Sequence, residues 1–152
     1  MSHPALRHTL TRNSDSLVGV TYVPYTTVIE IDGAGGAFAD SDVWTMPAGL
    51  LFKGFKILVT EAFDGVTPTL NVGTTADETA YVDSGGAAPV DLTAVAATSD
   101  PESAVVDLYL EATTTLRVNL GSGSTITAGK AYLIFEYLDF VKIADEGAQL
   151  SA

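Results

Sequence analysis

The sequence predicts an all-β protein, a two-sheet antiparallel sandwich of the jelly-roll type with an extended N-terminal arm. Short segments of alternating apolar and polar residues recur between clusters of Gly, Asp, Ser and Thr, as they do in sandwich strands and turns. No window of ten or more residues repeats apolar side chains at helical spacing, which disfavours folds built on crossover helices. The chain has 152 residues, of which 47% are hydrophobic and 17% charged, so one domain with a buried core is expected.

The N-terminal half contains three predicted strand regions. Residues 17–31 are rich in Val, Thr, Tyr and Ile and are interrupted by Pro24, so two short strands with a bend are expected. A glycine-rich run at residues 33–36 ends the second of them. Residues 53–61 and 69–72 alternate with period two, which predicts strands with one solvated side.

The C-terminal half adds strands at residues 105–110, 116–120 and 130–141. The last of these carries large apolar groups on both faces, with Ile134 and Leu138 on one and Leu133, Phe135 and Tyr137 on the other. It is therefore expected to be central in a sheet or buried at a subunit contact. At most one helical turn is expected, around residues 75–81. About eight strands joined by uneven loops fit a jelly roll, and an immunoglobulin-like sandwich is the alternative.

The pattern divides the chain into an N-terminal arm at residues 1–16, a sandwich domain at 17–143 and a small polar tail at 144–152. The arm has no apolar run of the kind found in secretory signals, which predicts synthesis in the cytoplasm. No stretch is long and apolar enough for a membrane span. Cysteine is absent, so disulfides and thiolate zinc sites are excluded. A formal charge of −12 disfavours binding to nucleic acid or anionic lipid.

Candidate catalytic groups are few, and no enzyme activity and no cofactor are expected. Both histidines, His3 and His8, lie in the arm, where nothing fixes their geometry. Acidic residues gather in the loop-rich stretch 63–86, where calcium binding or glycoside hydrolysis are the alternatives to solvated turns; these are Asp64, Asp77, Glu78 and Asp83. The run Gly33–Gly36 lacks the third glycine and the helix of a phosphate-binding loop, so it predicts a turn.

The single tryptophan, Trp44, has two interpretations. With Met46 and Pro47, its ring could form a platform that stacks on a sugar, as aromatic residues do in lectin-like sandwiches, and Tyr81 is the alternative contact. A lone tryptophan on a strand is more often part of a core or an interface. The second interpretation is preferred, and a carbohydrate-binding module is kept as an alternative function.

Three stretches resemble small virion proteins of tailed bacteriophages. The first is Pro-Ala-Gly at residues 47–49, which leads into a long predicted strand. The second is the strand end Leu-x-Val-Gly-Thr at residues 70–74, and the third, from residue 116 to 137, is similar to the closing half of the same sandwich. The resemblance spans residues 44–137.

This resemblance implies a jelly-roll decoration (cement) protein of the virion. Such a protein sits on the outer surface of the capsid, at junctions of the major capsid protein, commonly forms trimers, and has no catalytic residues. The N-terminal arm departs from the pattern, so a head-fibre base or a tail component is the alternative within the same family of structures.

The residues themselves also favour assembly. Arg7 and Arg12 against Asp15 give residues 1–16 a formal charge of +1, and because the whole chain carries −12, the remainder carries −13. A mildly basic arm on an acidic body suits docking to a second subunit or to the major capsid protein. The candidate oligomer or docking contacts are Arg7, Arg12, Trp44, Leu133, Phe135 and Tyr137.

Overall fold

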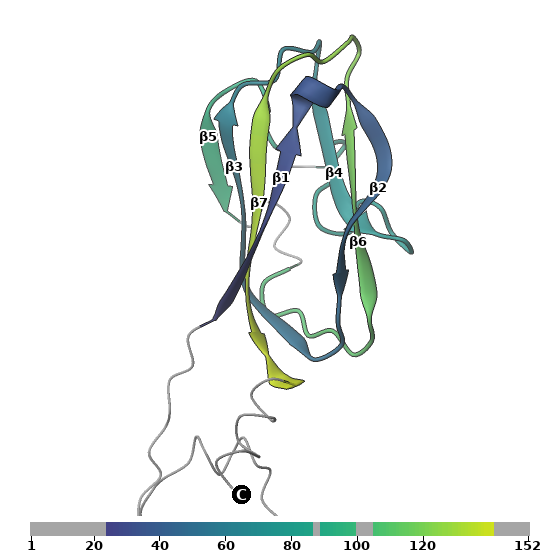
Figure 1. Ribbon diagram of the computed structural model, residues 1–152, viewed down its shortest axis with the longest axis vertical. Helices are drawn as coiled ribbons and strands as arrows, with labels where there is room; N and C mark the ends of the chain where they lie inside the picture. Colours follow the sequence, from purple (N-terminus) through teal and green to yellow (C-terminus); the bar gives the residue numbers. More distant parts are fainter. Residues whose placement is uncertain (1–23, 87–88, 100–104, 142–152) are drawn as a thin grey trace, which may run out of the picture.

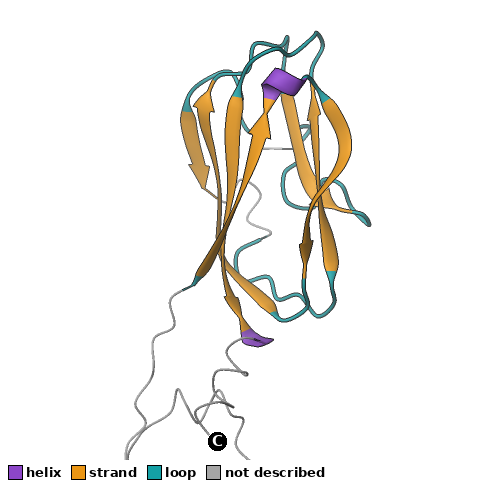
Figure 2. Ribbon diagram, in the orientation of Figure 1, coloured by secondary structure: helices purple, strands orange, loops and turns teal. Residues whose placement is uncertain are grey.

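The computed structural model describes residues 24–86, 89–99 and 105–141, which form two facing antiparallel sheets (Figure 1). The four-stranded sheet has the order β1-β7-β3-β5 and the three-stranded sheet the order β2-β6-β4. Their bounds are β1 Tyr25–Asp32, β2 Phe38–Met46, β3 Leu50–Glu61, β4 Thr69–Thr74, β5 Ala96–Ser99, β6 Thr114–Gly121 and β7 Lys130–Asp139. A short 3₁₀ helix, η1 (Gly33–Gly35), follows β1 at one end of the sandwich (Figure 2). The arm (1–16) and the tail (144–152) lie outside the described residues.

The strand pairings are nested, and this identifies the fold as a jelly roll. β1 pairs with β7, β2 with β6 and β3 with β5, so each pair encloses the next along the chain. The innermost pair is β4 with a single residue, Val82, which bridges to Val72. Such nesting arises when one long hairpin is rolled into two sheets, with the fifth of eight strands reduced here to one bridge. The order differs from that of an immunoglobulin sandwich, so that alternative is wrong.

The core lies between the sheets because the period-two alternation of the strands places one face of each sheet inward. Along β3, the inward residues Phe55, Ile57 and Val59 are at most 2% exposed. Along β7, Leu133 and Phe135 are 0% exposed. β6 contributes an inward row of its own from the opposite sheet. Each large side chain of this kind contributes about 1.5–3 kcal/mol when buried.

One predicted strand is wrong. Residues 105–110 are not a strand, because Asp107 adopts a φ of 64° and the Leu108 N–H donates to the Val105 carbonyl, 3.1 Å away, which makes a turn. Beyond this turn, the Leu51–Tyr109 bridge joins the segment to β3, together with backbone hydrogen bonds such as those from the Phe52 N–H to the Leu108 carbonyl and from the Leu110 N–H to the Leu50 carbonyl. Residues 75–81, where at most one helical turn was expected, form bends and turns, and the Ala80 N–H donates to the Asp77 carbonyl. These turns close over Gly73, where an added Cβ would lie 2.1 Å from the Asp77 carbonyl oxygen.

Two strands were not predicted, and one predicted strand lies outside the described residues. β2 carries Asp42 among its apolar residues and shifts register against β6 twice, so its alternation is broken. β5 is four residues long and consists of small residues. Of the two strands expected at residues 17–31, the second is β1, and residues 17–23 are outside the described part. Among the described residues, no helix is long and apolar enough to cross a membrane.

Replacing Phe135 by Ala should destabilise the protein by about 3–5 kcal/mol, because the ring fills space between the sheets that the surrounding strands cannot close. The exposed Val95→Ala variant, in the loop just before β5, is the control and should change stability little, since Val95 is 66% exposed. Urea unfolding of both variants measures the difference. Equal, small losses in the two variants would mean that the sheets are not held together here.

Candidate assembly surfaces

An aromatic cluster joins the two sheets. Trp44 of β2 lies between Phe52 of β3 and Phe135 and Tyr137 of β7, with ring centroids 6.2, 5.7 and 5.6 Å away. Phe55 stacks on Phe135 at 4.5 Å and extends the cluster along β3. Because Trp44 comes from the three-stranded sheet and the other rings from the four-stranded sheet, the cluster fixes the spacing of the layers.

Four of the predicted docking contacts lie in the described residues, and three of them, Trp44, Phe135 and Tyr137, belong to this cluster. Leu133 and Phe135 are 0% exposed, so their side chains are already covered within the chain. Trp44 and Tyr137 are half-buried and keep part of their surface in solvent. Their contact with a second chain stays a prediction. Arg7 and Arg12 lie outside the described residues.

The sugar-stacking alternative for Trp44 receives no support from its surroundings. Three aromatic rings pack around Trp44, and Tyr81, the second expected platform, is only 5% exposed. Burial also raises the pKa of Tyr81. The Tyr81 ring is therefore too enclosed to present its face to a ligand.

The outward side of the four-stranded sheet carries several apolar residues between charged ones. We call it the outer face. In an antiparallel sheet with one face on the core, the other face is normally polar. Here Val28 lies opposite Ile134, and Leu58 lies opposite Tyr132, all of them outward-facing and partly or largely exposed. Lys56 and Glu136, which also flank Ile134, supply charge on the same face.

The apolar surface continues to the end of the sheet where β7 finishes. Leu51 pairs with Leu138, and Tyr109 bridges to Leu51. Tyr109 and Phe140 are 50% and 41% exposed, and their rings meet edge to face at 6.3 Å. Exposed aromatic and aliphatic groups in one contiguous area are typical of a contact surface.

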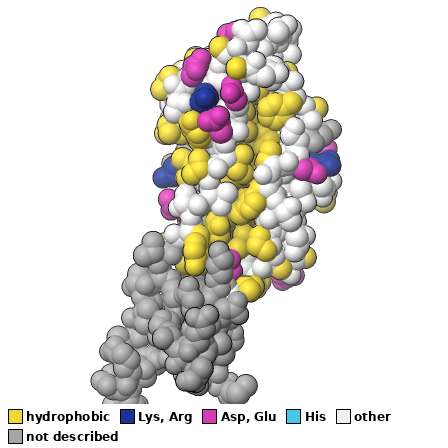
Figure 3. All heavy atoms as spheres, in the orientation of Figure 1, with side chains coloured by type: hydrophobic (Ala, Val, Ile, Leu, Met, Phe, Trp, Pro, Cys, Tyr) yellow, Lys and Arg dark blue, Asp and Glu magenta, His cyan; other side chains and the backbone are white. Residues whose placement is uncertain are grey.

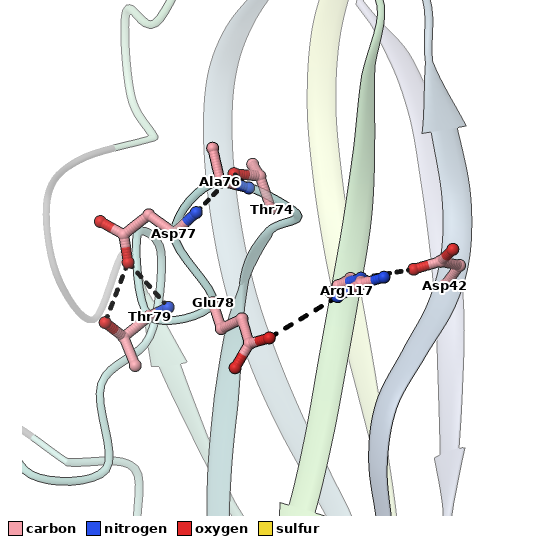
Figure 4. A network of polar contacts seen from close by, with 7 residues as sticks. All are labelled: Asp42, Thr74, Ala76, Asp77, Glu78, Thr79 and Arg117. Atoms are coloured by element: carbon pink, nitrogen blue, oxygen red, sulfur yellow. Dashed lines mark hydrogen bonds and ion pairs between the residues drawn. The ribbon is translucent and has the colours of Figure 1, made fainter.

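The four acidic residues considered as a catalytic or calcium site do not come together. Asp64 accepts hydrogen bonds from Thr127 and Ala128, and Asp83 accepts one from the Gly85 N–H. Asp77 accepts from Thr79, and Glu78 forms an ion pair with Arg117 (Figure 4). Asp77 and Asp83 therefore fix their own turns, whereas Asp64 and Glu78 join segments that are distant in the sequence. Across the described ranges, no three acidic or histidine side chains form a group suited to a metal ion.

Arg117 is a structural residue that the sequence did not single out. Its Nε lies 2.7 Å from Asp42 of β2, and its Nη1 lies 3.6 Å from Glu78 in the loop after β4 (Figure 4). The ion pairs thus tie an edge strand and a loop to β6. Because all three side chains are partly exposed, each pair contributes about 0–1 kcal/mol. The signal in the sequence is one cation within the apolar alternation of residues 116–120.

No protein-family model and no curated protein matches the sequence. Solved structures with a similar fold include a chain of the cyanophage Pam1 capsid asymmetric unit, with a TM-score of 0.50 and 18% identity over 83% of this chain and 93% of that chain. A chain in the acid-stable capsid of Helicobacter pylori bacteriophage KHP30 matches with a TM-score of 0.55 and 15% identity, over 78% of this chain and 89% of that chain. A chain in the capsid of Ralstonia phage GP4 matches with a TM-score of 0.55 and 17% identity, over 89% of this chain and 94% of that chain. At these identities the likeness shows a shared fold, over 78–89% of this chain and 89–94% of the matched chains.

Removing the Thr127 hydroxyl should make the protein less sensitive to acid. Hydrogen bonds from the Thr127 side chain, and then from the backbone N–H groups of Thr127 and Ala128, lower the pKa of Asp64 from 3.8 to about 2. A depressed carboxyl pKa adds stability above the unfolded value, and that stability is lost as the pH falls through the folded value. In Thr127→Val, the pKa of Asp64 should rise, and less stability should be lost between pH 3.8 and about 2. NMR titration of the carboxyl carbons, with Asp91 as an internal reference, measures the pKa of Asp64 in both proteins. Identical Asp64 titration in both proteins would contradict the assignment.

Proposed function

We propose that this chain is a structural protein of a tailed-phage virion, a decoration protein that binds the outer surface of the major capsid shell and stabilises it. The observation that carries the proposal is the similarity in fold to chains of three phage capsids, each matched over 89% or more of its length. The likeness therefore extends over nearly all of each of those three capsid chains.

The surfaces of the sandwich support a role in assembly. The outer face and the exposed pair Tyr109 and Phe140 offer apolar area that a single chain leaves in water. Burying such area favours association by about 25 cal/mol per Å² before the entropic cost of association is subtracted. Contacts made only in the assembled shell stabilise that state selectively. The scattered, hydrogen-bonded acids are in keeping with a role without catalysis.

We propose further that the outer face joins copies of the chain into a homotrimer. Val28 and Ile134 form a cross-strand pair at its centre, with Leu58 on the next strand. The row is flanked by Lys56 and Glu136, so opposite charges surround an apolar centre. Interfaces between subunits commonly have this arrangement of apolar centre and polar rim.

Placing a carboxylate at the centre of the outer face should weaken self-association. In Ile134→Glu or Val28→Glu, assembly would desolvate an unpaired charge, so the oligomer fraction should fall. Thr45→Glu, an exposed position on β2 of the other sheet, is the matched control and should assemble normally. Analytical ultracentrifugation measures the oligomer and urea unfolding confirms the fold. Unchanged association in both outer-face variants, or a wild-type chain that stays monomeric in solution and on the particle, contradicts this interface.

Deleting residues 1–16 should leave folding intact and reduce binding to phage heads, because the arm carries net positive charge and the body is strongly acidic. The control is the full-length protein with the substitutions Arg7→Ser and Arg12→Ser, which separates the effect of the arm's charge from the effect of its length. Occupancy of undecorated heads at limiting protein concentration is the measurement. Equal occupancy by truncated and full-length protein would show that docking does not use the arm. Antibody labelling of the fibres or tail in place of the head shell would replace the decoration role with the fibre or tail alternative.

A further inference from the structure

The four edges of the two sheets differ in how they are protected against pairing with another strand. β2 shifts register twice against β6, between Phe38 and Ser41 and between Asp42 and Trp44. Bulges of this kind bend an edge away from a flat pairing geometry. β5 is only four residues long. The outer side of β4 is occupied at Val72, which exchanges both backbone hydrogen bonds with Val82.

β1 is the exception. It pairs with β7 over eight consecutive residues without a register shift, and within the described residues no strand lies on its other side. It contains no proline, no lysine and no bulge. Glu30 and Asp32 lie at its C-terminal end, and the rest is uncharged. A long, regular, uncovered edge strand is a ready template for an added strand.

The space beside this edge is lined by apolar side chains. Figure 3 shows a strip of hydrophobic surface between β1 and β2, where the sandwich opens toward the viewer. Ile29 of β1, Trp44 and Phe38 of β2 and Tyr137 of β7 are partly exposed residues packed against the core. Tyr25 stacks on Tyr137 at 6.0 Å and extends this area to the start of β1. We call these five residues the edge strip.

We propose that residues 17–23 of a second copy of this chain bind here as an additional antiparallel strand on the free edge of β1. The segment reads Leu-Val-Gly-Val-Thr-Tyr-Val, which is uncharged and rich in residues that favour strands. It lies outside the described residues and immediately precedes Pro24 and β1. The proposal needs only that copies of the chain meet, so it deepens the proposed homo-oligomer and does not depend on the decoration role.

The side-chain pattern selects one register. If Val20 lies opposite Ile29, then Val18, Val20 and Tyr22 share the inward side of the added strand, because side chains alternate along it. These three would cover the edge strip. Gly19 and Thr21 would lie on the outer side, opposite Glu30 and Val28. A shift by one residue would turn the apolar set outward and leave the edge strip open.

Pro24 explains why the strand must come from another copy. The same register within one chain would need a two-residue hairpin loop made of Pro24 and Tyr25. Tight hairpins of this length use type I′ or II′ turns, which require a positive φ at the first loop position. Proline is restricted to a φ near −65° and cannot take that position. Tyr25 is in any case already paired with Tyr137 as part of β1.

Charge favours the antiparallel direction. An antiparallel strand places Leu17 beside Asp32, so the chain preceding it, with Arg12, continues past the end of β1 that carries Glu30 and Asp32. The parallel direction would carry Arg12 to the opposite end, beside Tyr25. Residues 1–16 have a formal charge of +1 against −13 for the rest, so the arm of one copy is attracted to the body of the next.

A disulfide cross-link between copies tests this register. The chain has no cysteine, so single variants report one position each. Full-length Thr21→Cys is mixed with full-length Val28→Cys under mild oxidation, in concentrated solution and on phage heads. In the proposed strand these residues are directly opposite, where cross-strand Cβ atoms are about 4.5–5.5 Å apart. The matched control replaces Val28→Cys with Thr45→Cys, an exposed position on the protected edge strand β2.

A disulfide-linked heterodimer of the two chains, identified by mass spectrometry and absent from the control mixture, is the expected result. It should disappear when Val20→Glu is added to the Thr21→Cys chain, because the carboxylate would face the edge strip. No heterodimer in solution or on heads, or equal yields in the control mixture, overturns the strand proposal. Cross-linking without any binding to heads would retain the added strand and refute the decoration role instead.

Discussion

The contact of Trp44 with the aromatic rings of β3 and β7 is the interaction on which the rest of this molecule depends. In a sandwich the two sheets share no backbone hydrogen bonds, so only side chains and connecting loops hold them face to face. Here Phe52, Phe135 and Tyr137 surround the Trp44 ring from the opposite sheet. This contact sets the separation of β1 from β2 and therefore the width of the open edge between them. The apolar outer face is available for assembly only because the core behind it is complete.

Jelly rolls leave four sheet edges, and the way each is treated indicates what the protein contacts. Three edges of this sandwich carry a bulge, a covering segment or a very short strand, which are the usual defences against unwanted pairing. Within the described residues β1 has none of these, and a hydrophobic strip lies at the surface beside it (Figure 3). A sandwich with such an edge and apolar residues on its outer face has the features expected of a subunit that is completed by its neighbours.

The sequence predicted the fold class and the central strands because their alternation is strong, as in residues 53–61 and 130–141. It failed where alternation was broken or misleading. β2 carries bulges that disrupt the period, and residues 105–110 alternate like a strand although Asp107 turns the chain with a positive φ. Leu133 and Phe135 were named as candidate docking contacts, and the structure buries both in the core of the chain, because periodicity distinguishes two faces of a strand without saying which one faces the core. The outward-facing partner Ile134 carries the surface role proposed here.

Hydrogen–deuterium exchange on the assembled chain tests the central claim most directly, because backbone amides at a free edge exchange until a strand covers them. Peptides from β1 are compared between the dilute chain and the oligomer or the decorated head, with peptides from β2 as the internal reference. Strong added protection of β1 in the assembled state, with β2 unchanged, is the result that the account predicts. Unchanged exchange in β1 on assembly would contradict it, because it would leave the one undefended edge of the sandwich still open to solvent.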